Sequence, residues 1–402
     1  MNLLLISSVN LTINPRIYKE LQLASGLGYQ ITFIGFNLGN WSDAGDQLIK
    51  KKYPGIKFIY LEASRKKYFT WLYFSLLHIF YRFLWKFKKR SVKLSAFAHS
   101  KGTKPLLHLL NSLLRSDKYD LIVAHTLAAL YPSAYIAKKY ASNFAFDVED
   151  FHPGEKIFKD AVNEKMRREI IMKNILSSAS YVTAASGLIS KNVEQLVPGL
   201  KVVTVLNYFP GSEFVRPVLS TGDKLKLVWF SQNINAGRGL ELILSVWEYL
   251  KPKFEITLIR KIDNNFYKKY IIQHPDINIK APISQNELHK SLSTYNIGLA
   301  IDIDNDDYNR KLAITNKILA YYQAGLYILA TDTMAQQDFI NEHPSHGVII
   351  EQTSSSLRDT LIKMYSDKSR IRLKSEQRFI DASASSWEVE SKIIKNEWDN
   401  IN

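Results

Sequence analysis

The sequence predicts an α/β protein with two doubly wound, Rossmann-like domains that face each other across a cleft. Three observations predict it. Apolar strand-like runs alternate with helical patterns in the first half of the chain, a stretch rich in turn residues follows, and the same alternation then begins again. Strands that alternate with helices form parallel sheets, and 402 residues suffice for two such domains with separate cores.

The expected elements of the first half follow from apolar runs and helix signals. The helix over 15–27 has Pro15 in its first turn and Gly28 directly after its last turn, which are preferred positions for these residues. The other helices are expected near 104–115, over 128–140 and 160–177, and in a short piece ending at 196. The strands are expected over 3–9, 31–36, 57–61, 120–125, 144–148, 181–186 and 201–206.

The second half repeats the pattern. Strands are expected over 225–230, 254–259, 277–281 and 297–303, and helices over 239–250, 266–273 and 285–293. A helix over 315–324 is closed by Gly325 and followed by a buried strand over 327–330. We therefore expect an N-terminal domain over 1–207, a linker over 208–223, a C-terminal domain over 224–380 and a C-terminal helix within 381–402.

Composition narrows the possible functions. The chain has no cysteine, which excludes disulfides, thiolate metal sites and a cysteine nucleophile. The first ten residues, MNLLLISSVN, carry no basic leader and read as a first strand. We therefore expect a cytoplasmic protein that is not secreted.

The net charge of +15 is concentrated in one stretch. Between Lys51 and Asp120 there are 16 Lys and Arg residues against three acidic residues. A local excess of this size indicates an anionic partner surface. The sequence contains no nucleic-acid-binding motif, so we expect no nucleic-acid partner.

The segment between Tyr68 and Arg90, within a basic and aromatic region over 65–93, allows three interpretations. His78 and Arg82 interrupt the apolar run that a membrane span needs. A helix packed in the core of an α/β domain is the simplest alternative. We favour an interfacial helix on an anionic membrane, with Trp71 and Trp85 at headgroup depth and its basic flanks on lipid phosphates.

Polar residues follow two of the predicted strands. His125 closes one strand, and the loop after the next, from Asp147 to Glu155, contains Glu149 and His152. Since the carboxyl ends of parallel strands meet at one edge of a sheet, His125 and His152 are expected near one another. The alternatives are a structural histidine and a solvated acidic loop that caps the next helix.

Two loops of the second half carry further candidates. Gly237-Arg238-Gly239 lies between a strand and a helix, where backbone amides and a fixed guanidinium suit a phosphate group, although a plain loop is the alternative. The acidic run from Asp302 to Asp307 lacks the glycine and glutamate of a calcium-binding EF-hand. We interpret it as a solvated loop and expect no metal site.

Residues 312–332, LAITNKILAYYQAGLYILATD, resemble the donor-site segment of retaining GT-B glycosyltransferases, the large group 1 type that builds bacterial cell-surface polysaccharides. The order Asn316-Lys317, Tyr321, Gly325 and then Thr331-Asp332 carries this resemblance. Further matches extend it over nearly the whole chain: the start of the first helix at Asn14, DLIVAHT, FDVEDFHPGE, Arg238-Gly239 and Ser386-Trp387-Glu388.

The resemblance implies a metal-independent hexosyltransferase that needs no cofactor beyond its donor substrate, a nucleotide-diphosphate sugar. It places His125 beside the transferred sugar, with Glu149 and His152 orienting sugar and acceptor. Donor-binding residues would be Gly237, Arg238, Asn316, Lys317, Thr331 and Asp332. The acceptor would be a glycan, lipid-linked at the inner face of the cell membrane, and the last helix would cross back to the first domain.

Three positions depart from the family pattern. Ala320 replaces the glutamate that holds the nucleotide ribose, Leu312 replaces its partner acid, and Gln232 replaces an arginine commonly paired with Arg238. Lys317, Asn316 and Asp332 are candidates for replacement contacts. The alternative function is a catalytically degenerate GT-B protein that serves as a membrane-bound scaffold or partner subunit.

Overall fold

A computed structural model describes residues 1–231, 233–304 and 307–401. The chain forms two compact units, residues 1–206 together with 391–402, and residues 207–390. Gln232 and Asp306 of the sequence analysis lie outside the described residues.

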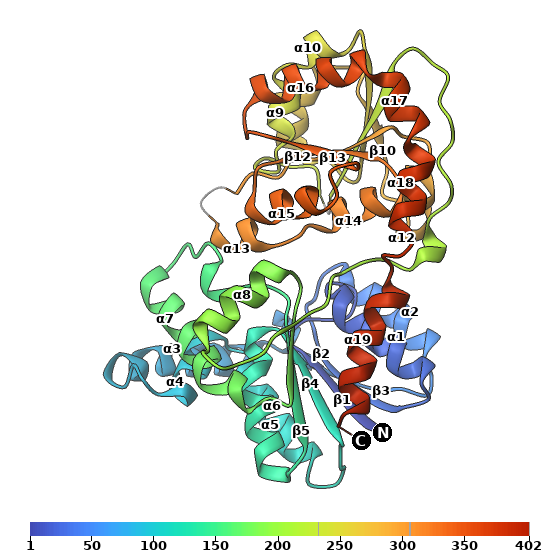
Figure 1. Ribbon diagram of the computed structural model, residues 1–402. Helices are drawn as coiled ribbons and strands as arrows, with labels where there is room; N and C mark the ends of the chain where they lie inside the picture. Colours follow the sequence, from blue (N-terminus) through green and yellow to red (C-terminus); the bar gives the residue numbers. More distant parts are fainter. Residues whose placement is uncertain (232, 305–306, 402) are drawn as a thin grey trace. The chain divides into compact units, whose positions relative to one another are not determined.

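The N-terminal unit is built on a parallel sheet in the order β3-β2-β1-β4-β5-β6-β7 (Figure 1). Its strands are β1(Asn2–Ser7), β2(Gln30–Asn37), β3(Lys57–Glu62), β4(Leu121–His125), β5(Asn143–Val148), β6(Tyr181–Ala184) and β7(Val203–Thr204). Its helices are α1(Pro15–Gly26), α2(Ser42–Lys52), α3(Tyr68–Phe87), α4(Val92–His99), α5(Thr103–Leu113), α6(Leu127–Tyr140), α7(Ala161–Ile175) and α8(Gly187–Leu196), with short 3₁₀ turns η1(Arg65–Lys67), η2(His152–Gly154) and η3(Leu176–Ser178).

The C-terminal unit has a second parallel sheet, in the order β10-β9-β8-β11-β12-β13. Its strands are β8(Leu225–Phe230), β9(Phe254–Ile259), β10(Asn278–Lys280), β11(Ile297–Ala300), β12(Tyr327–Thr331) and β13(Gly347–Ile350). The helices are α9(Leu240–Leu244), α10(Trp247–Leu250), α11(Asn264–Phe266), α12(Gln285–Leu292), α13(Tyr308–Leu312), α14(Asn316–Gln323), α15(Met334–Glu342), α16(Ser354–Ser366), α17(Lys368–Leu373) and α18(Ser375–Ala382), with the 3₁₀ turn η4(Gly211–Glu213) and the π-helix η5(Tyr267–Ile271).

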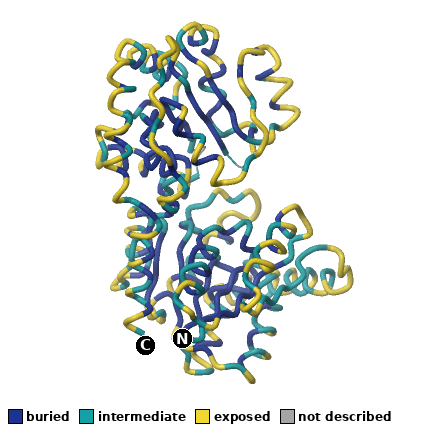
Figure 2. The backbone as a smooth tube through the Cα atoms, turned by 90° about the vertical axis from the view of Figure 1, so that its right-hand side faces the viewer, coloured by how far each residue is buried: buried dark blue, intermediate teal, exposed yellow. Residues whose placement is uncertain are grey.

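Both sheets are buried on both faces, which explains why their strands read as continuous apolar runs. Figure 2 shows the central strands of each unit as buried and the outer helices as partly exposed. In the first strand, for example, Leu3, Leu4 and Leu5 have no exposed surface. The last helix, α19(Trp387–Asp399), ends in the N-terminal unit, where the buried Trp398 donates from Nε1 to the Tyr181 hydroxyl at 2.8 Å.

Each sheet has one point where the strand order reverses. In the N-terminal unit it lies between β1 and β4, whose last residues Ser7 and His125 are paired in register. In the C-terminal unit it lies between β8 and β11. Ligands of open α/β sheets bind outside the carboxyl ends of the strands at such points, so these two edges are the places to look for a site.

Three expected elements differ from the structure. The helix expected over 239–250 is interrupted at Val246, whose φ of −119° lies outside the helical range, so that α9 and α10 are separate. The helix expected over 266–273 is the short α11 continued by the π-helix η5. The strand expected over 201–206 is shorter in the structure and forms β7 at the edge of the sheet, where Val203 and Thr204 pair with β6.

Candidate functional site

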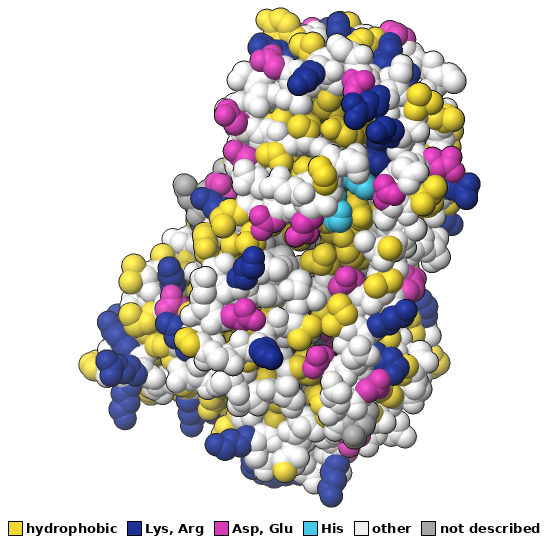
Figure 3. Space-filling view, viewed as in Figure 1, with side chains coloured by type: hydrophobic (Ala, Val, Ile, Leu, Met, Phe, Trp, Pro, Cys, Tyr) yellow, Lys and Arg dark blue, Asp and Glu magenta, His cyan; other side chains and the backbone are white. Residues whose placement is uncertain are grey.

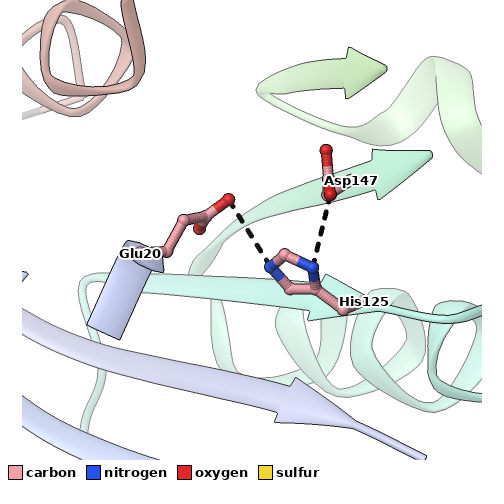
Figure 4. A group of neighbouring side chains, drawn as sticks. All are labelled: Glu20, His125 and Asp147. Atoms are coloured by element: carbon pink, nitrogen blue, oxygen red, sulfur yellow. Dashed lines mark ion pairs between the residues drawn. The ribbon is translucent and has the colours of Figure 1, made fainter. Parts of the chain in front are cut away.

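The edge of the N-terminal sheet carries a cluster of charged side chains from three elements. Arg16 and Glu20 lie four residues apart on α1 and therefore on one face of that helix. His125 ends β4, and its register partner Asp147 lies on the neighbouring strand β5. Figure 4 shows Glu20 and Asp147 approaching the imidazole of His125 from opposite sides.

The cluster is held by short contacts among buried groups. Arg16 donates from Nε and Nη2 to the two oxygens of Asp147, at 2.6 and 2.7 Å. His125 Nδ1 lies 2.8 Å from Glu149 Oε1 and 3.4 Å from Asp147 Oδ2, and its Nε2 lies 3.5 Å from Glu20 Oε1. Four side chains make up the cluster around His125: Arg16, Glu20, Asp147 and Glu149. Among them, only that of Glu149 reaches the surface appreciably, with 20% of its area exposed.

These contacts settle the charge of the histidine. Burial by itself lowers the pKa of His125, but the charge of Glu20 and the hydrogen bonds that the imidazole donates to Asp147, Glu149 and Glu20 outweigh it and raise that pKa well above its ordinary value. Burial raises the pKa of Asp147, whereas Arg16 and then His125 lower it more strongly, so the Asp147 carboxyl is held ionised. His125 is therefore an imidazolium held among carboxylates.

Ligand atoms of Glu20, His125 and Asp147 lie close enough together to suggest a metal site. The chemistry of the donors argues against one. Both Asp147 oxygens already accept from the Arg16 guanidinium, so this carboxylate is engaged by a cation of the protein itself. The cluster fits an ion-paired network that positions Glu149.

The structure brings Glu149 to His125 but places His152 in a different network. His152 Nδ1 lies 3.0 Å from Glu155 Oε1, and the backbone carbonyl of His152 accepts from Arg168 at 2.7 Å. Burial lowers the pKa of His152, and the hydrogen bond and charge of Glu155 raise it above the ordinary value. The role of His152 in orienting a substrate stays a prediction.

Sequence reasoning missed Arg16 and Glu20. Both lie on a helix more than 100 residues before His125, and alternating polar residues on a surface helix give no sign that two of them turn inward. One signal was present: Asn14 caps α1 through its side chain, and its amide also donates to Glu149 Oε1 at 2.6 Å.

At the edge of the C-terminal sheet, Gly237-Arg238-Gly239 follows β8. Both glycines have positive φ, +76° and +84°. A Cβ on Gly239 would lie 1.5 Å from the carbonyl oxygen of Ile301, so only glycine allows this loop to approach the end of β11. Arg238 is partly exposed and forms no ion pair with any acidic side chain that the structure describes.

Lys317 and Asp302 form the second feature of this edge. Lys317 Nζ donates to Asp302 Oδ1 at 2.7 Å and lies 5.2 Å from the ring centre of Trp229. Thr331 donates to the Asp302 carbonyl at 2.5 Å, which ties the ends of β11 and β12 together. The other oxygen of Asp302, Oδ2, is buried and has no hydrogen-bond partner among the described residues. Asp302 is thus an ion-pair partner, not the solvated residue expected from the sequence.

The remaining predicted donor residues have internal partners. Asn316 Oδ1 accepts from Asn207 at 2.8 Å, and Asp332 Oδ1 accepts from Gln352 at 3.0 Å. Leu312 and Ala320, which stand where acids are expected, are both fully buried. Asp302 is an acid at this edge that sequence reasoning did not assign to the donor site.

Helix α3 shows a reversed polarity. His78 Nδ1 lies 3.0 Å from the Phe97 carbonyl of α4, and Arg82 pairs with Asp160 at 2.6 Å, so the polar stripe faces the protein. The exposed apolar side chains follow one another at steps of three and four residues on the opposite stripe: Phe69, Tyr73, Leu76, Phe80, Phe83 and Phe87. A water-exposed helix normally has the opposite arrangement.

The tryptophans of α3 are not where the sequence analysis expected them. Trp85 is fully buried, donates to Ser95 at 2.9 Å and lies under the Arg167 guanidinium, so its predicted place at headgroup depth is wrong. Trp71 is partly exposed between the cations of Arg65 and Lys101. Within the described ranges, no helix combines the length and apolar character that crossing a membrane requires.

Comparisons with known proteins place the fold. No protein-family profile matches the chain, and no curated protein matches it in sequence. Solved structures do match over the whole chain. The chain has the GT-B fold. This confirms the predicted pair of doubly wound α/β domains.

Three of these structures are HepE, a sucrose-phosphate synthase and a galactosyltransferase. HepE of Anabaena in complex with UDP has a TM-score of 0.69 at 12% identity and covers 100% of both chains. Sucrose-phosphate synthase of Thermosynechococcus elongatus has a TM-score of 0.71 at 11% identity, covering 100% of this chain and 99% of that one. The lipopolysaccharide outer core galactosyltransferase WaaB has a TM-score of 0.63 at 10% identity, again covering 100% and 99%.

Proposed function

We propose that this protein is a glycosyltransferase that moves a sugar from a nucleotide-diphosphate donor to a membrane-associated, lipid-linked glycan, with retention of configuration and without a metal. In this reaction the bond between the anomeric carbon and the phosphate oxygen breaks, and the nucleoside diphosphate leaves with the electron pair. The acceptor oxygen bonds to the carbon and gives up its proton. The developing charge on the diphosphate has to be stabilised by cations.

The observation that carries the proposal is Arg238. It is a partly exposed guanidinium without an acidic partner in the described residues, it lies between two glycines of positive φ, and it stands at the switch point of the C-terminal sheet. An unneutralised arginine at this place suits the oxygens of a diphosphate. Two of the similar structures support the same chemistry, because one is a complex with UDP and the other a complex with UDP-glucose.

Lys317 and Asp302 complete the donor site in this proposal. The ammonium of Lys317 adds a second positive charge, fixed by Asp302 and the ring of Trp229. The unpartnered Asp302 Oδ2 supplies an acceptor for donor hydroxyls, which replaces the carboxylate lost at Ala320.

In the N-terminal unit, Glu149 is the group that we assign to substrate. Its carboxylate is partly exposed, while His125 behind it has no exposed surface. His125 is therefore a positioning residue, and its imidazolium holds Glu149 in place through the 2.8 Å contact. Asn14 holds the same oxygen from the other side at 2.6 Å.

Helix α3 is the proposed membrane contact. Its exposed apolar stripe lies between two exposed basic groups: Arg65, Lys66 and Lys67 before it, and Lys86, Lys88, Lys89 and Arg90 at its end. Figure 3 shows Lys and Arg side chains gathered with apolar ones on the side of the N-terminal unit that carries α3 and α4. Apolar residues at the acyl boundary and cations on lipid phosphates are the two requirements of an interfacial helix. With this contact, the membrane face that we propose for the protein is the inner face of the cell membrane.

Calorimetric titration with UDP, GDP, ADP and dTDP, without metal and then with Mg²⁺, tests the donor site. We expect one nucleotide to bind without metal and Arg238→Ala to weaken that binding by about ten-fold or more, the value of a charge-assisted contact. Arg216→Ala is the matched control, because Arg216 is an exposed arginine of the same unit that pairs with Glu376. It should leave the affinity unchanged.

Transfer is then tested with the sugar of the nucleotide that binds, by following the anomeric configuration of the product by NMR. Binding that is unaffected by Arg238→Ala would contradict the assigned site. If a folded sample binds none of these nucleotides, the result would contradict a transferase activity and favour a catalytically degenerate scaffold. The apolar residues Leu312 and Ala320, which are buried where acids are expected, are consistent with such a scaffold.

A further inference from the structure

The C-terminal unit contains a cavity of about 540 Å³ that lies away from its predicted donor site. Its lining includes Tyr327, the first residue of β12, whereas Thr331 at the donor edge is the last residue of the same strand. Four steps along the extended strand separate these two residues by about 13 Å. Strand β13, helices α16, α17 and α18 and the loops beside them supply the rest of the lining. A volume of this size is in the range of small-molecule sites.

The charged lining of this cavity is mainly basic. Lys363, Arg370, Lys374 and Arg378 line it together with one acid, Asp367. Arg370 lies 3.7 Å from Asp367, and both side chains are well exposed, so this pair is weak. The other three cations have no acidic partner among the residues that the structure describes.

Arg378 is the unusual member of this group. It is only 2% exposed, although buried charges are normally paired with an opposite charge. Its Nε donates to the Gly325 carbonyl at 3.0 Å and its Nη2 to the Ile371 carbonyl at 2.7 Å. These two contacts fix the guanidinium plane and do not neutralise it. Burial lowers the pKa of Arg378 to about 10, and the nearby Tyr327 hydroxyl raises it slightly, so the group remains charged near neutral pH.

The rest of the cavity is apolar. Tyr327, Val348, Met364 and Ile371 line it, and the Arg378 guanidinium lies 5.5 Å from the centre of the Tyr327 ring. Figure 3 shows Lys and Arg side chains beside an apolar hollow on this face of the C-terminal unit. The cavity thus offers an anion site next to an apolar surface.

We propose that this cavity is a second ligand site, which binds a small organic anion whose phosphate or carboxylate faces Arg378 and the rim cations and whose apolar body packs on Tyr327, Val348 and Met364. The arrangement matches the usual composition of ligand pockets, an apolar wall with few fixed polar groups. Arg378 is already held in one orientation by two carbonyls, so little conformational entropy is lost when it takes an anion.

Calorimetric titration of the full chain with phenyl phosphate tests this site, with benzoate, inorganic phosphate and benzyl alcohol as partial ligands. Binding of phenyl phosphate should exceed that of inorganic phosphate, which lacks the apolar body, and that of benzyl alcohol, which lacks the charge. Phenyl phosphate and benzoate differ only in the anion, so their ratio shows which head group the site prefers.

Arg370→Glu with Lys374→Glu should weaken phenyl phosphate binding by about ten-fold or more. These two rim residues are exposed, so the double variant should keep the fold. Arg378→Ala is less suitable, because it removes a buried side chain and could disturb the fold. Lys290→Glu is the control, because it makes the same kind of charge reversal at an exposed lysine of α12 outside the cavity. It should leave phenyl phosphate binding unchanged. Binding should also persist in Arg238→Ala, which separates this site from the donor site. The absence of phenyl phosphate binding, or binding that the double variant leaves unchanged, would overturn the proposal.

Discussion

Arg16 and Asp147 form a two-point ion pair at the edge of the N-terminal sheet, with Nε and Nη2 of the arginine 2.6 and 2.7 Å from the two carboxylate oxygens. The pair makes further hydrogen bonds to its surroundings. Arg16 donates from Nη1 to the Val205 carbonyl at 2.8 Å, and Thr183 donates to Asp147 Oδ1 at 2.6 Å. The pair therefore joins α1, β5, β6 and the end of the sheet.

Asp147→Ala should destabilise the N-terminal unit strongly. The substitution leaves the guanidinium of Arg16 buried without a counter-charge, and breaking a buried pair in this way costs about 3–5 kcal/mol of the free energy of unfolding. Urea unfolding measures the loss, and hydrogen exchange of the amides of β4 and β5 shows where it occurs. Glu169→Ala removes the exposed pair with Lys173 on α7 and should cost about 0.5 kcal/mol or less. Equal effects of the two substitutions would contradict a structural role for the buried pair.

The stability of the N-terminal unit should depend on pH through His125. Its folded-state pKa is raised by Glu20, Asp147 and Glu149 against the effect of burial. Its contribution is therefore fully present below the unfolded value of about 6.5 and is lost as the pH rises through the higher folded value. Urea unfolding from about pH 6 upward should show this loss in the natural chain and a smaller one in His125→Gln.

His343 provides the control for that experiment. Burial lowers its pKa, and the charge of Glu342 only partly offsets this, so it gives no stabilising charge that is lost at alkaline pH. His343→Gln should leave the alkaline loss unchanged. An NMR titration that finds the His125 imidazole neutral at pH 7 would contradict the raised pKa.

The architecture was predictable from the sequence because parallel strands buried on both faces leave a strong apolar signal, and both sheets were found this way. The partners of His125 were not predictable. Helix α1 and strand β4 are distant in sequence. The proximity of Glu20 to His125 can therefore be inferred only when the order of the strands in the sheet is known. The orientation of helix α3 was not predictable either. The periodicity of its sequence separates a polar stripe from an apolar one, but it does not show which stripe faces the protein.

Lys317→Met should weaken binding of the nucleoside diphosphate by about ten-fold or more, because it removes a cation at the edge of β11 while keeping an apolar stem against Trp229. The substitution also leaves Asp302 without its partner, and this bare carboxylate repels a diphosphate. The double variant Asp302→Asn with Lys317→Met removes that repulsion. Weak binding by the double variant as well would show that repulsion by Asp302 does not explain the loss, whereas full recovery would show that Lys317 only neutralises Asp302 and that Asp302 itself does not bind the donor.

Helix α3 should bind vesicles that contain anionic lipid through both of its features. Replacing Lys86, Lys88 and Lys89 by glutamine removes three exposed cations, each worth about 1 kcal/mol near an anionic surface, so co-sedimentation should weaken about 100-fold. The matched control replaces Lys50, Lys51 and Lys52, three exposed lysines in the last turn of α2, and should have little effect if α3 is the contact.

The apolar stripe is tested by Leu76→Ser, Phe80→Ser and Phe83→Ser together, which should also abolish vesicle binding but leave the fold intact, because all three side chains are exposed. Phe158→Ser, at an exposed phenylalanine outside α3, is the control. High salt should weaken binding of the natural chain, since the lysines act through screened charge. If the serine variant still binds the vesicles while the glutamine variant does not, the apolar stripe does not enter the lipid. A second copy of the chain would then be the better partner for the stripe. A change in the oligomeric state of the serine variant would reveal this.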